Sequence, residues 1–262
     1  MRVGVRSVNR DREWRLGLGA ASLLAVAAVW QVAALMVRSL LLPTFTDTIA
    51  ACARLAASRD LWQALWVSNQ AAALGFLSAG VVGIAIGLVT GRWRLAEQMV
   101  DPYLNILLAV PKAALIPVLI MATGLGLLSR VLVVFSFSVV SVAVNTRAGL
   151  RLVDRSVIEM AHSFGANEMQ LWRKVLLPAA LPGIIAGLRI GLIRSVSAMI
   201  TVELLLLALG VGRLIMTYQD SFQAPNLYAT ALFVVAEALL LTQALNWAER
   251  RAFAHIGQAV VE

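Results

Sequence analysis

The sequence predicts an all-α integral membrane protein with about six transmembrane helices. Of its 262 residues, 60% are hydrophobic and only 14% are charged, whereas soluble domains average about 45–50% apolar and about 25% charged residues. A soluble domain of this size leaves too much of its area exposed to hide so much apolar surface. The apolar residues are also gathered in runs close to the ~20 residues that a helix needs to cross a bilayer.

Six segments approach spanning length, and they lack the alternation of apolar and polar residues that a barrel strand would show. They are Leu16–Val37, Gln70–Val89, Ile106–Thr123, Leu127–Val144, Gly183–Leu209 and Leu227–Leu245. Pro111 and Pro117 fall inside the third segment, which is expected to bend within a helix bundle. Three serines, Ser136, Ser138 and Ser141, interrupt the apolar run of the fourth.

Lysine and arginine are distributed unevenly over the predicted loops. If the N-terminus is cytoplasmic, the outside segments hold only Arg38, Arg54, Arg59, Arg130 and Arg213, against fourteen basic residues inside. The positive-inside rule therefore places both termini in the cytoplasm, as an even number of spans requires. The net charge of +8 is then explained by a membrane surface, and no nucleic-acid partner is expected. The first span is too long for the apolar region of a cleaved signal peptide.

The residues that commonly carry chemistry are sparse. Cys52 is the only cysteine, so no intrachain disulfide can form. His162 and His255 are far apart in the sequence, and no Cys/His cluster has metal-ligand spacing. The chain also lacks the Gly-x-x-x-x-Gly-Lys-Ser/Thr phosphate loop. We therefore expect no metal, no bound cofactor and no catalytic residue, and any ATP-derived energy must come from a partner.

We divide the chain into three parts: residues 1–69, with a cytoplasmic tail, the first span and an outer segment; residues 70–250, the membrane core; and residues 251–262, a cytoplasmic tail. In the outer segment, Thr48–Trp66 is expected to form a helix near the outer surface. Trp62 and Trp66 are four residues apart and so share a face of it. That face either lies at the membrane interface, where tryptophan is enriched, or packs on the bundle.

The longest cytoplasmic connection, residues 146–181, predicts two short helices. Ser156 and Glu159 fit a capping box at the start of the first. The helix then carries one apolar stripe, made of Val157, Met160, Ala161 and Phe164. Gly165 follows, at the point where a helix ends with a left-handed residue.

The second short helix is predicted to begin after Asn167, a suitable N-cap. One of its faces holds Met169, Trp172 and Arg173. Arg173 and Lys174 lie in the last turn, where the helix dipole favours cations. Leu177-Pro178 and Leu181-Pro182 are expected to break the chain before the fifth span. The surface of this hairpin suits either docking in a groove of a soluble partner or lying on the inner leaflet.

The same loop resembles the EAA motif of ABC import permeases, which reads Glu-Ala-Ala, three residues, Gly, nine residues, Ile, any residue, Leu-Pro. The corresponding residues here are Glu159-Met160-Ala161, Gly165 and Val175-Leu176-Leu177-Pro178. Met160 and Val175 depart mildly from the motif. The resemblance covers roughly residues 41–251 and is closest to the sulfonate, taurine and nitrate branch. Further segments that carry it are Leu42-Pro43-Thr44, Asp101-Pro102-Tyr103, Ala114-Leu115-Ile116-Pro117, Asn145-Thr146-Arg147-Ala148-Gly149-Leu150 and Leu177-Pro178-Ala179-Ala180-Leu181-Pro182.

This resemblance implies a type I ABC importer permease fold in the bacterial cytoplasmic (inner) membrane. It implies two permease subunits, expected as a homodimer, each docked on a cytoplasmic ATPase that uses ATP and Mg²⁺. A periplasmic or lipid-anchored solute-binding protein would deliver the solute. The implied coupling helix is Asn167–Lys174, with Gly165 allowing the turn before it and Pro178 and Pro182 fixing its entry into the fifth span. The expected ATPase-coupling residues are Glu159, Ala161, Gly165, Asn167, Met169, Trp172, Arg173, Leu177 and Pro178, with Glu159 acting either as a helix cap or in a pair between subunits.

Ionisable residues inside spans are costly and are functional candidates. Those in or near the predicted spans are Lys112, Arg189, Arg194, Glu203 and Glu237. Arg194 lies about 16 Å along the fifth span, on one face with Ser197, Ala198 and Thr201, which suits a sulfonate or carboxylate anion. The alternative is a structural ion pair of Arg194, for instance with Glu237. The expected substrate pathway comprises Arg194, Ser197, Thr201, Glu203 and Lys112, and the expected solute is a small anion or zwitterion of the sulfonate, taurine or nitrate type.

Two other functions stay open from the residues alone. The chain could be a secondary transporter driven by an ion gradient, a class that often shows internal repeats, but no convincing repeat relates residues 16–144 to residues 183–245. It could also be a membrane protein with a purely structural or assembly role. A neighbouring gene for a soluble ATPase would favour the importer over both.

Overall fold

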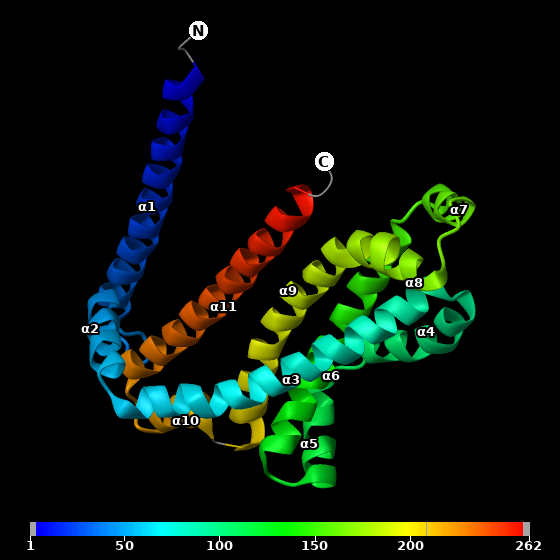
Figure 1. The fold of residues 1–262 in the computed structure, drawn as a ribbon. Coiled ribbons are helices and arrows are strands. Elements are labelled where there is room, and N and C mark those ends of the chain that lie inside the picture. The colour runs from blue at the N-terminus through cyan, green and yellow to red at the C-terminus, as the bar shows by residue number, and fades with distance from the viewer. Residues whose placement is uncertain (1–3, 208, 259–262) are drawn as a thin grey trace. The chain divides into compact units, whose positions relative to one another are not determined.

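The computed structural model describes residues 4–207 and 209–258, and every regular element in this part of the chain is a helix (Figure 1). The α-helices are α1 (Gly4–Val37), α2 (Phe45–Ala56), α3 (Arg59–Arg92), α4 (Arg94–Ala109), α5 (Lys112–Thr123), α6 (Leu127–Arg151), α7 (Arg155–Ser163), α8 (Glu168–Leu171), α9 (Leu177–Val202), α10 (Gly210–Asp220) and α11 (Ala224–Gln258). Two π-helical segments, η1 (Trp172–Leu176) and η2 (Glu203–Leu207), flank α9. The predicted all-α class is confirmed.

Five stretches of helix in the described residues are long and apolar enough to cross a membrane. They are Gly17–Val37, Arg59–Arg92, Leu127–Arg151, Glu168–Leu205 and Ala224–Arg251. Helices α4 and α5 pass the same test together, but they are bent by 102° at the break between them. The chain thus has five continuous candidate spans, and six if the broken pair counts as one, which agrees with the predicted multi-pass architecture.

The prediction of a single bent helix over residues 106–123 is wrong. Helix α4 ends at Ala109, and Val110 adopts an extended conformation with φ −68° and ψ 130°. A residue that precedes proline is sterically disfavoured in the helical region, and Pro111 has no N–H with which to continue the helix. Pro117, by contrast, lies inside α5 without ending it.

The single outer helix expected over residues 48–66 is also wrong, because the chain divides there into α2 and the start of α3. Helix α2 ends at Ala56. The Ser58 hydroxyl then accepts a hydrogen bond from the Leu61 N–H at 3.4 Å, so Ser58 begins a new helix. The second span consequently begins at Arg59, well before the expected Gln70.

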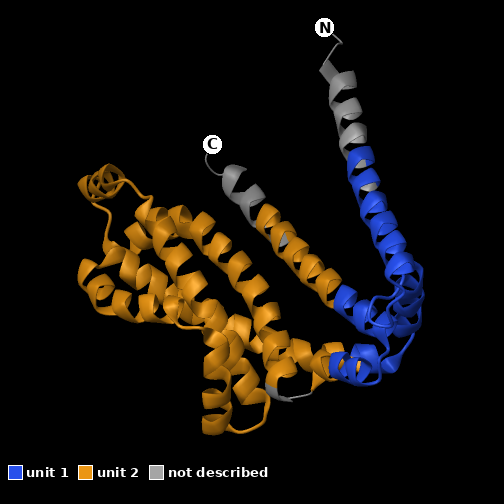
Figure 2. Cartoon of the chain, turned by 180° about the vertical axis from the view of Figure 1, so that it is seen from behind, with its two compact units in different colours: residues 1–62, 214–233 blue, residues 63–213, 234–262 orange. Residues whose placement is uncertain are grey.

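The structure separates into two compact units, residues 1–62 with 214–233 and residues 63–213 with 234–262 (Figure 2). In the smaller unit, Trp30 of α1 holds the connection that leads to α2. Its indole N–H donates to the Pro43 carbonyl at 3.0 Å, and its ring lies 5.7 Å from that of Phe45 and 5.8 Å from that of Tyr228, centroid to centroid. Within the smaller unit, Trp30 thus joins α1 to the start of α2 and to Tyr228.

Helix α6 is the most buried candidate span of the larger unit, and glycines on α3 and α9 allow close approach to it. A Cβ added at Gly87 of α3 would lie 2.5 Å from a side-chain atom of α6. A Cβ added at Gly183 of α9 would lie 2.5 Å from the Cα of Gly149. In the same interface, the Ser138 hydroxyl donates to the Gly191 carbonyl at 2.9 Å. Small residues and interhelical hydrogen bonds of this kind stabilise helix packing in membranes.

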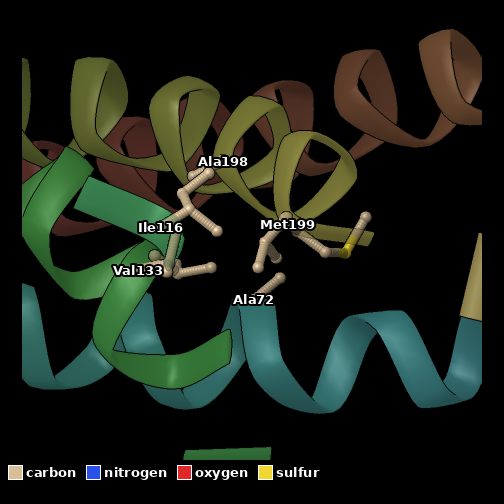
Figure 3. Close-up of a cluster of buried hydrophobic side chains, with 7 residues drawn as sticks. Ala72, Ile116, Val133, Ala198 and Met199 are labelled. Atoms are coloured by element: carbon tan, nitrogen blue, oxygen red, sulfur yellow. The ribbon is translucent and has the colours of Figure 1, made fainter. Parts of the chain in front are cut away.

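One apolar cluster ties the short helix α5 to its neighbours. Its buried members are Ala72, Ile116, Val133, Val134, Ala198, Met199 and Val202, from α3, α5, α6 and α9. Figure 3 shows Ile116, Val133, Ala198 and Met199 gathered from three helices on the side of Ala72 that faces them. The cluster holds α5 in place although the chain breaks just before it.

Candidate functional site

The connection between α6 and α9 forms a hairpin of α7 and α8 at one end of the larger unit (Figure 1). The predicted capping box at Ser156 and Glu159 is wrong, because Asp154 is the N-cap of α7. Its carboxylate accepts a hydrogen bond from the Ser156 N–H at 3.0 Å. Aspartate is a strong N-cap and its charge also complements the helix dipole. Glu159 therefore lies beyond the first turn of α7, where it cannot cap the helix, and is exposed.

Gly165 ends the first helix of the hairpin as predicted, with φ +77°. The Gly165 N–H donates to the His162 carbonyl at 2.9 Å, and the Ala166 N–H donates to the Ala161 carbonyl at 3.0 Å. This pair of hydrogen bonds is a Schellman motif. Nothing lies within 4 Å of the place where a Cβ would stand on Gly165. The position thus needs glycine for its backbone conformation and not for lack of space.

Asn167 caps the second helix, which confirms its predicted place. The Asn167 side-chain oxygen accepts from the Gln170 N–H at 2.9 Å. The Gln170 side-chain oxygen accepts in return from the Asn167 N–H at 3.0 Å. The two bonds make a reciprocal capping box. The turn between the helices is therefore closed by hydrogen bonds on both sides of Gly165.

The expected break at Pro178 and Pro182 is wrong, since the chain stays helical over Glu168–Leu205. The π-helical segment η1 lies directly before Pro178, and the Leu177 N–H donates to the Trp172 carbonyl five residues back. The wider π turn leaves Pro178 in the first turn of α9, where a missing N–H is tolerated. The second helix of the hairpin is therefore continuous with a candidate span.

The hairpin has a packed face and an open face. Leu171 and Leu176 are buried in a cluster with Leu150 of α6, and Ile158 and Ala161 of α7 pack against it. The predicted stripe is thus divided, because Ala161 points inward while its other members do not. The open face carries large apolar side chains: Met160 is 53%, Phe164 85% and Met169 67% exposed. Contiguous exposed apolar side chains are typical of surfaces that meet another protein or the membrane.

Two contacts hold the hairpin to the junction of α3 and α4. The rings of Trp172 and Trp93 lie 6.2 Å apart, centroid to centroid. Arg92 forms an ion pair with Glu168 at 3.6 Å. Arg173 and Lys174, by contrast, are exposed. The hairpin thus presents both apolar and basic groups from a fixed position.

Glu203, a predicted pathway residue, is fully buried in a closed network. Its carboxylate accepts from the Ser68 hydroxyl at 2.7 Å, the Gly212 N–H at 3.1 Å and the Arg130 guanidinium at 3.4 Å. These partners come from α3, α10 and α6. Arg130, which was counted with the outside segments, lies within α6 and is itself buried. Sequence reasoning missed Ser68 and Arg130 as partners, although a carboxylate predicted inside a span needs a donor or cation nearby.

Lys112 and Arg194 lie close enough for their charges to interact. The Lys112 ammonium also lies 5.8 Å from the centre of the Phe137 ring, a cation–π contact. Among the residues that the structure describes, neither cation forms an ion pair with a carboxylate. Glu237, the partner considered for Arg194, accepts instead from Asn69. Two unpaired cations therefore lie on helices of the membrane core.

The predicted hydroxyl neighbours of Arg194 are committed to their own helix. Ser197 donates to the Ile193 carbonyl at 3.1 Å, and Thr201 donates to the Ser197 carbonyl at 2.7 Å. Such bonds to the carbonyl four residues back are usual for hydroxyls in helices. In this arrangement neither hydroxyl proton is available to a ligand. Arg194 is then the group on this face that can bind an anion.

Residues 80–253 match the family model described as binding-protein-dependent transport system inner membrane component. The chain belongs to this family. It is 31% identical to the putative aliphatic sulfonates transport permease protein SsuC of Bacillus subtilis (strain 168), over 86% of this chain and 83% of that protein. It is 29% identical to the taurine transport system permease protein TauC of Escherichia coli (strain K12), over 93% of both chains.

The fold is also similar to that of a chain in the inward-facing MetNI methionine ABC transporter. The TM-score is 0.58 at 24% identity, and the match covers 74% of this chain and 94% of that one. The resemblance stated from the EAA-like loop is thereby confirmed. The chain is a permease subunit of a binding-protein-dependent ABC importer, and not an enzyme, because the ATPase of these systems is a separate subunit. The alternative of a secondary transporter is excluded.

Proposed function

We propose that the α7–α8 hairpin is the element through which this permease subunit docks on its cytoplasmic ATPase. The observation that carries the proposal is a rigid, capped hairpin with an open apolar face, made of Met160, Phe164 and Met169. A groove on the ATPase would bury these side chains. Arg173 and Lys174 lie beside them for acidic partners, and Glu159, free of any capping role, would pair with a basic group of another subunit.

In this proposal, coupling requires a lever and no reactive group. Glu168–Leu205 is continuous helix, so a push on α8 moves the inner part of α9 with it. Trp172, Leu177 and Pro178 lie at the joint between docking helix and span. ATP and Mg²⁺ would be used entirely by the ATPase. A second copy of this chain would complete the pathway, and a solute-binding protein would deliver the solute from outside.

The proposed topology places both termini and the hairpin in the cytoplasm of a bacterium, with lipid around the spans. It rests on the excess of basic residues in the segments assigned to the inside. The hairpin and the connection around Arg92 and Arg94 then face the same side. A cysteine-accessibility map with a membrane-impermeant reagent tests this. In a Cys52→Ala background, labelling of Phe164→Cys, an exposed position of the hairpin, from the outside of intact cells would contradict the topology.

We further propose that the imported solute is a small anion or zwitterion such as a sulfonate. The two unpaired cations, Lys112 and Arg194, support this proposal, together with relatives named for aliphatic sulfonates and taurine. Glu203 would position the outer end of α9 and not touch the solute, since its network leaves no free acceptor face. In an uptake assay with a sulfonate, Arg194→Ala should lose the preference for the anion while assembly stays intact. Unchanged uptake would overturn the assignment of Arg194.

Docking can be tested at Gly165 with two substitutions of opposite conformational effect. Proline cannot adopt the φ of +77° found there, whereas asparagine tolerates left-handed backbone better than most residues. In a pull-down with the ATPase encoded beside the permease, wild type and Gly165→Asn should retain the ATPase and Gly165→Pro should lose it. Retention by all three proteins would place docking elsewhere, and retention by none would show that this ATPase does not bind the permease.

A further inference from the structure

A cavity of about 590 Å³ lies in the larger unit beside the base of the hairpin. It is formed where α3 gives way to α4 and where α6 gives way to α7. Its lining consists of Thr90, Gly91, Arg92, Arg94, Glu97, Leu150, Arg151, Val153, Arg155, Ile158 and Leu176. The volume is within the range of small-molecule sites, which is about 300–1,000 Å³. None of the predicted coupling or pathway residues lines this cavity.

The lining carries four arginines and one carboxylate. Glu97, the single acid, is already paired with Arg151 and with Arg147. Within the described part of the chain, Arg94 and Arg155 form no ion pair with a carboxylate. Both are exposed residues, so their guanidinium groups are accessible, and a cleft lined by charges of one sign concentrates ions of the opposite sign. The cavity therefore offers positive charge that no carboxylate of its own lining neutralises.

Arg92 gives a second, independent indication. Its Nε atom is buried and has no hydrogen-bond partner among the described residues. A buried guanidinium N–H without an acceptor is destabilising, and the single ion pair of Arg92, with Glu168 at 3.6 Å, is too long to be a hydrogen bond. The Arg92 side chain is nevertheless 28% exposed, so an anionic oxygen in the cavity can reach its terminal nitrogens, which the long ion pair leaves available.

We propose that this cavity binds a phosphate-bearing anion, supplied either by the headgroup of an anionic lipid or by a soluble phosphate. Guanidinium groups bind phosphate oxygens in bidentate fashion. Basic pockets between membrane helices on the cytoplasmic side are sites for anionic headgroups. The lipid source rests on the cytoplasmic placement of the hairpin given under the proposed function, whereas the phosphate chemistry does not.

Occupation of the cavity has a mechanical consequence. Arg92 and Arg94 belong to the α3–α4 junction, and Arg155 is the first residue of α7. One phosphate that contacts both sides would link the docking hairpin to the membrane core. The contact would stiffen the base of the hairpin without touching its open face. A bound anion would therefore strengthen the transmission of ATPase motion from the hairpin to the membrane core.

The test is native mass spectrometry of the assembled importer in detergent, with phosphatidylglycerol added in one arm and inorganic phosphate in the other. The variant is Arg94→Gln with Arg155→Gln, which removes two charges without breaking an ion pair. The matched control is Arg54→Gln with Arg59→Gln, two exposed arginines elsewhere in the chain. We expect the wild type and the control to bind alike. The cavity variant should bind at least about tenfold more weakly, because the loss of even one of its two charge-assisted contacts costs about that factor.

The two arms identify the source of the phosphate. Preferential binding of phosphatidylglycerol supports the lipid, and preferential binding of inorganic phosphate supports the soluble ligand. Equal binding by the three proteins in both arms, or no binding at all, would overturn the proposal. Release of the ATPase from the cavity variant, with the control still assembled, would also overturn it, because the cavity would then be a protein-docking surface. Failure of the Gly165 pull-down would not affect these readouts.

Discussion

The substitution Gly183→Ala tests the close packing of α6 and α9 directly. An added Cβ would lie 2.5 Å from the Gly149 Cα, 2.7 Å from the Asn145 carbonyl oxygen and 2.8 Å from the Gly149 nitrogen. All three are backbone atoms of α6, so no side-chain rotation can relieve the overlap. The two helices would have to move apart along their whole interface.

The expected magnitude follows from two opposing effects. Overpacking of a tight interface costs about 1–3 kcal/mol, and rigid backbone neighbours place this site at the upper end. Replacing glycine by alanine inside a helix returns about 0.5–1 kcal/mol through backbone entropy and propensity. The net destabilisation is therefore about 2 kcal/mol, equivalent to a fall of about 4–8 °C in Tm for a chain of this length.

The assay is thermal unfolding of the detergent-purified importer, followed by fluorescence-detected size exclusion. Two other glycines provide matched controls for the same chemical change. At Gly80 an added Cβ meets only the end of the Leu188 side chain at 3.3 Å, and at Gly19 it meets nothing within 4 Å. Gly80→Ala should melt near the wild type and Gly19→Ala at or above it. A Gly183→Ala protein that melts as high as the wild type would refute the packing explanation.

Three further predictions concern other parts of the chain. Glu203→Ala leaves Arg130 buried without its counter-charge and should destabilise the protein by about 3–5 kcal/mol. Glu203→Gln keeps an acceptor for Ser68 and should melt at a higher temperature than Glu203→Ala. Identical melting temperatures of the two variants would contradict a polar role for Glu203. Asn167→Ala removes the capping box and about 1 kcal/mol of local stability, so hydrogen exchange at the capped amide should be about fivefold faster, and unchanged exchange would mean that the cap is not formed. Burial raises the pKa of the Cys52 thiol, so less thiolate is present at neutral pH and maleimide labelling should be slower than for a free thiol; a rate equal to that of glutathione would contradict this.

The features that sequence reasoning predicted well are those determined by neighbouring residues. Long apolar runs indicated the spans because a bilayer requires continuous helix. Gly165 and Asn167 were placed correctly because caps depend on only a few adjacent positions. The cap of α7 was misplaced for the same reason, since Asp154 and Ser156 compete at a spacing of two residues and both are good N-caps.

The features that sequence reasoning missed depend on distant partners. Ser68 and Glu203 are 135 positions apart, and nothing local to either residue indicates the other. Lys112 and Arg194 were chosen separately, and only the fold brings their charges together. One long-range feature did leave a signal in the sequence. Glycines recur every four residues at 83, 87 and 91 and at 183, 187 and 191, the spacing at which small residues form one face of a packed membrane helix.

The π turn at η1 also determines the rotation about the helix axis between α8 and the part of α9 that carries Arg194. Successive residues of an α-helix are about 100° apart around the axis. The widened turn over Trp172–Leu176 therefore rotates Met169 by a large angle relative to Arg194, compared with an uninterrupted α-helix. A one-residue deletion within this turn would keep both helical segments intact, yet it would turn the open face of the hairpin toward a different direction. The direction in which the open face of the hairpin points thus depends on one extra residue in this turn.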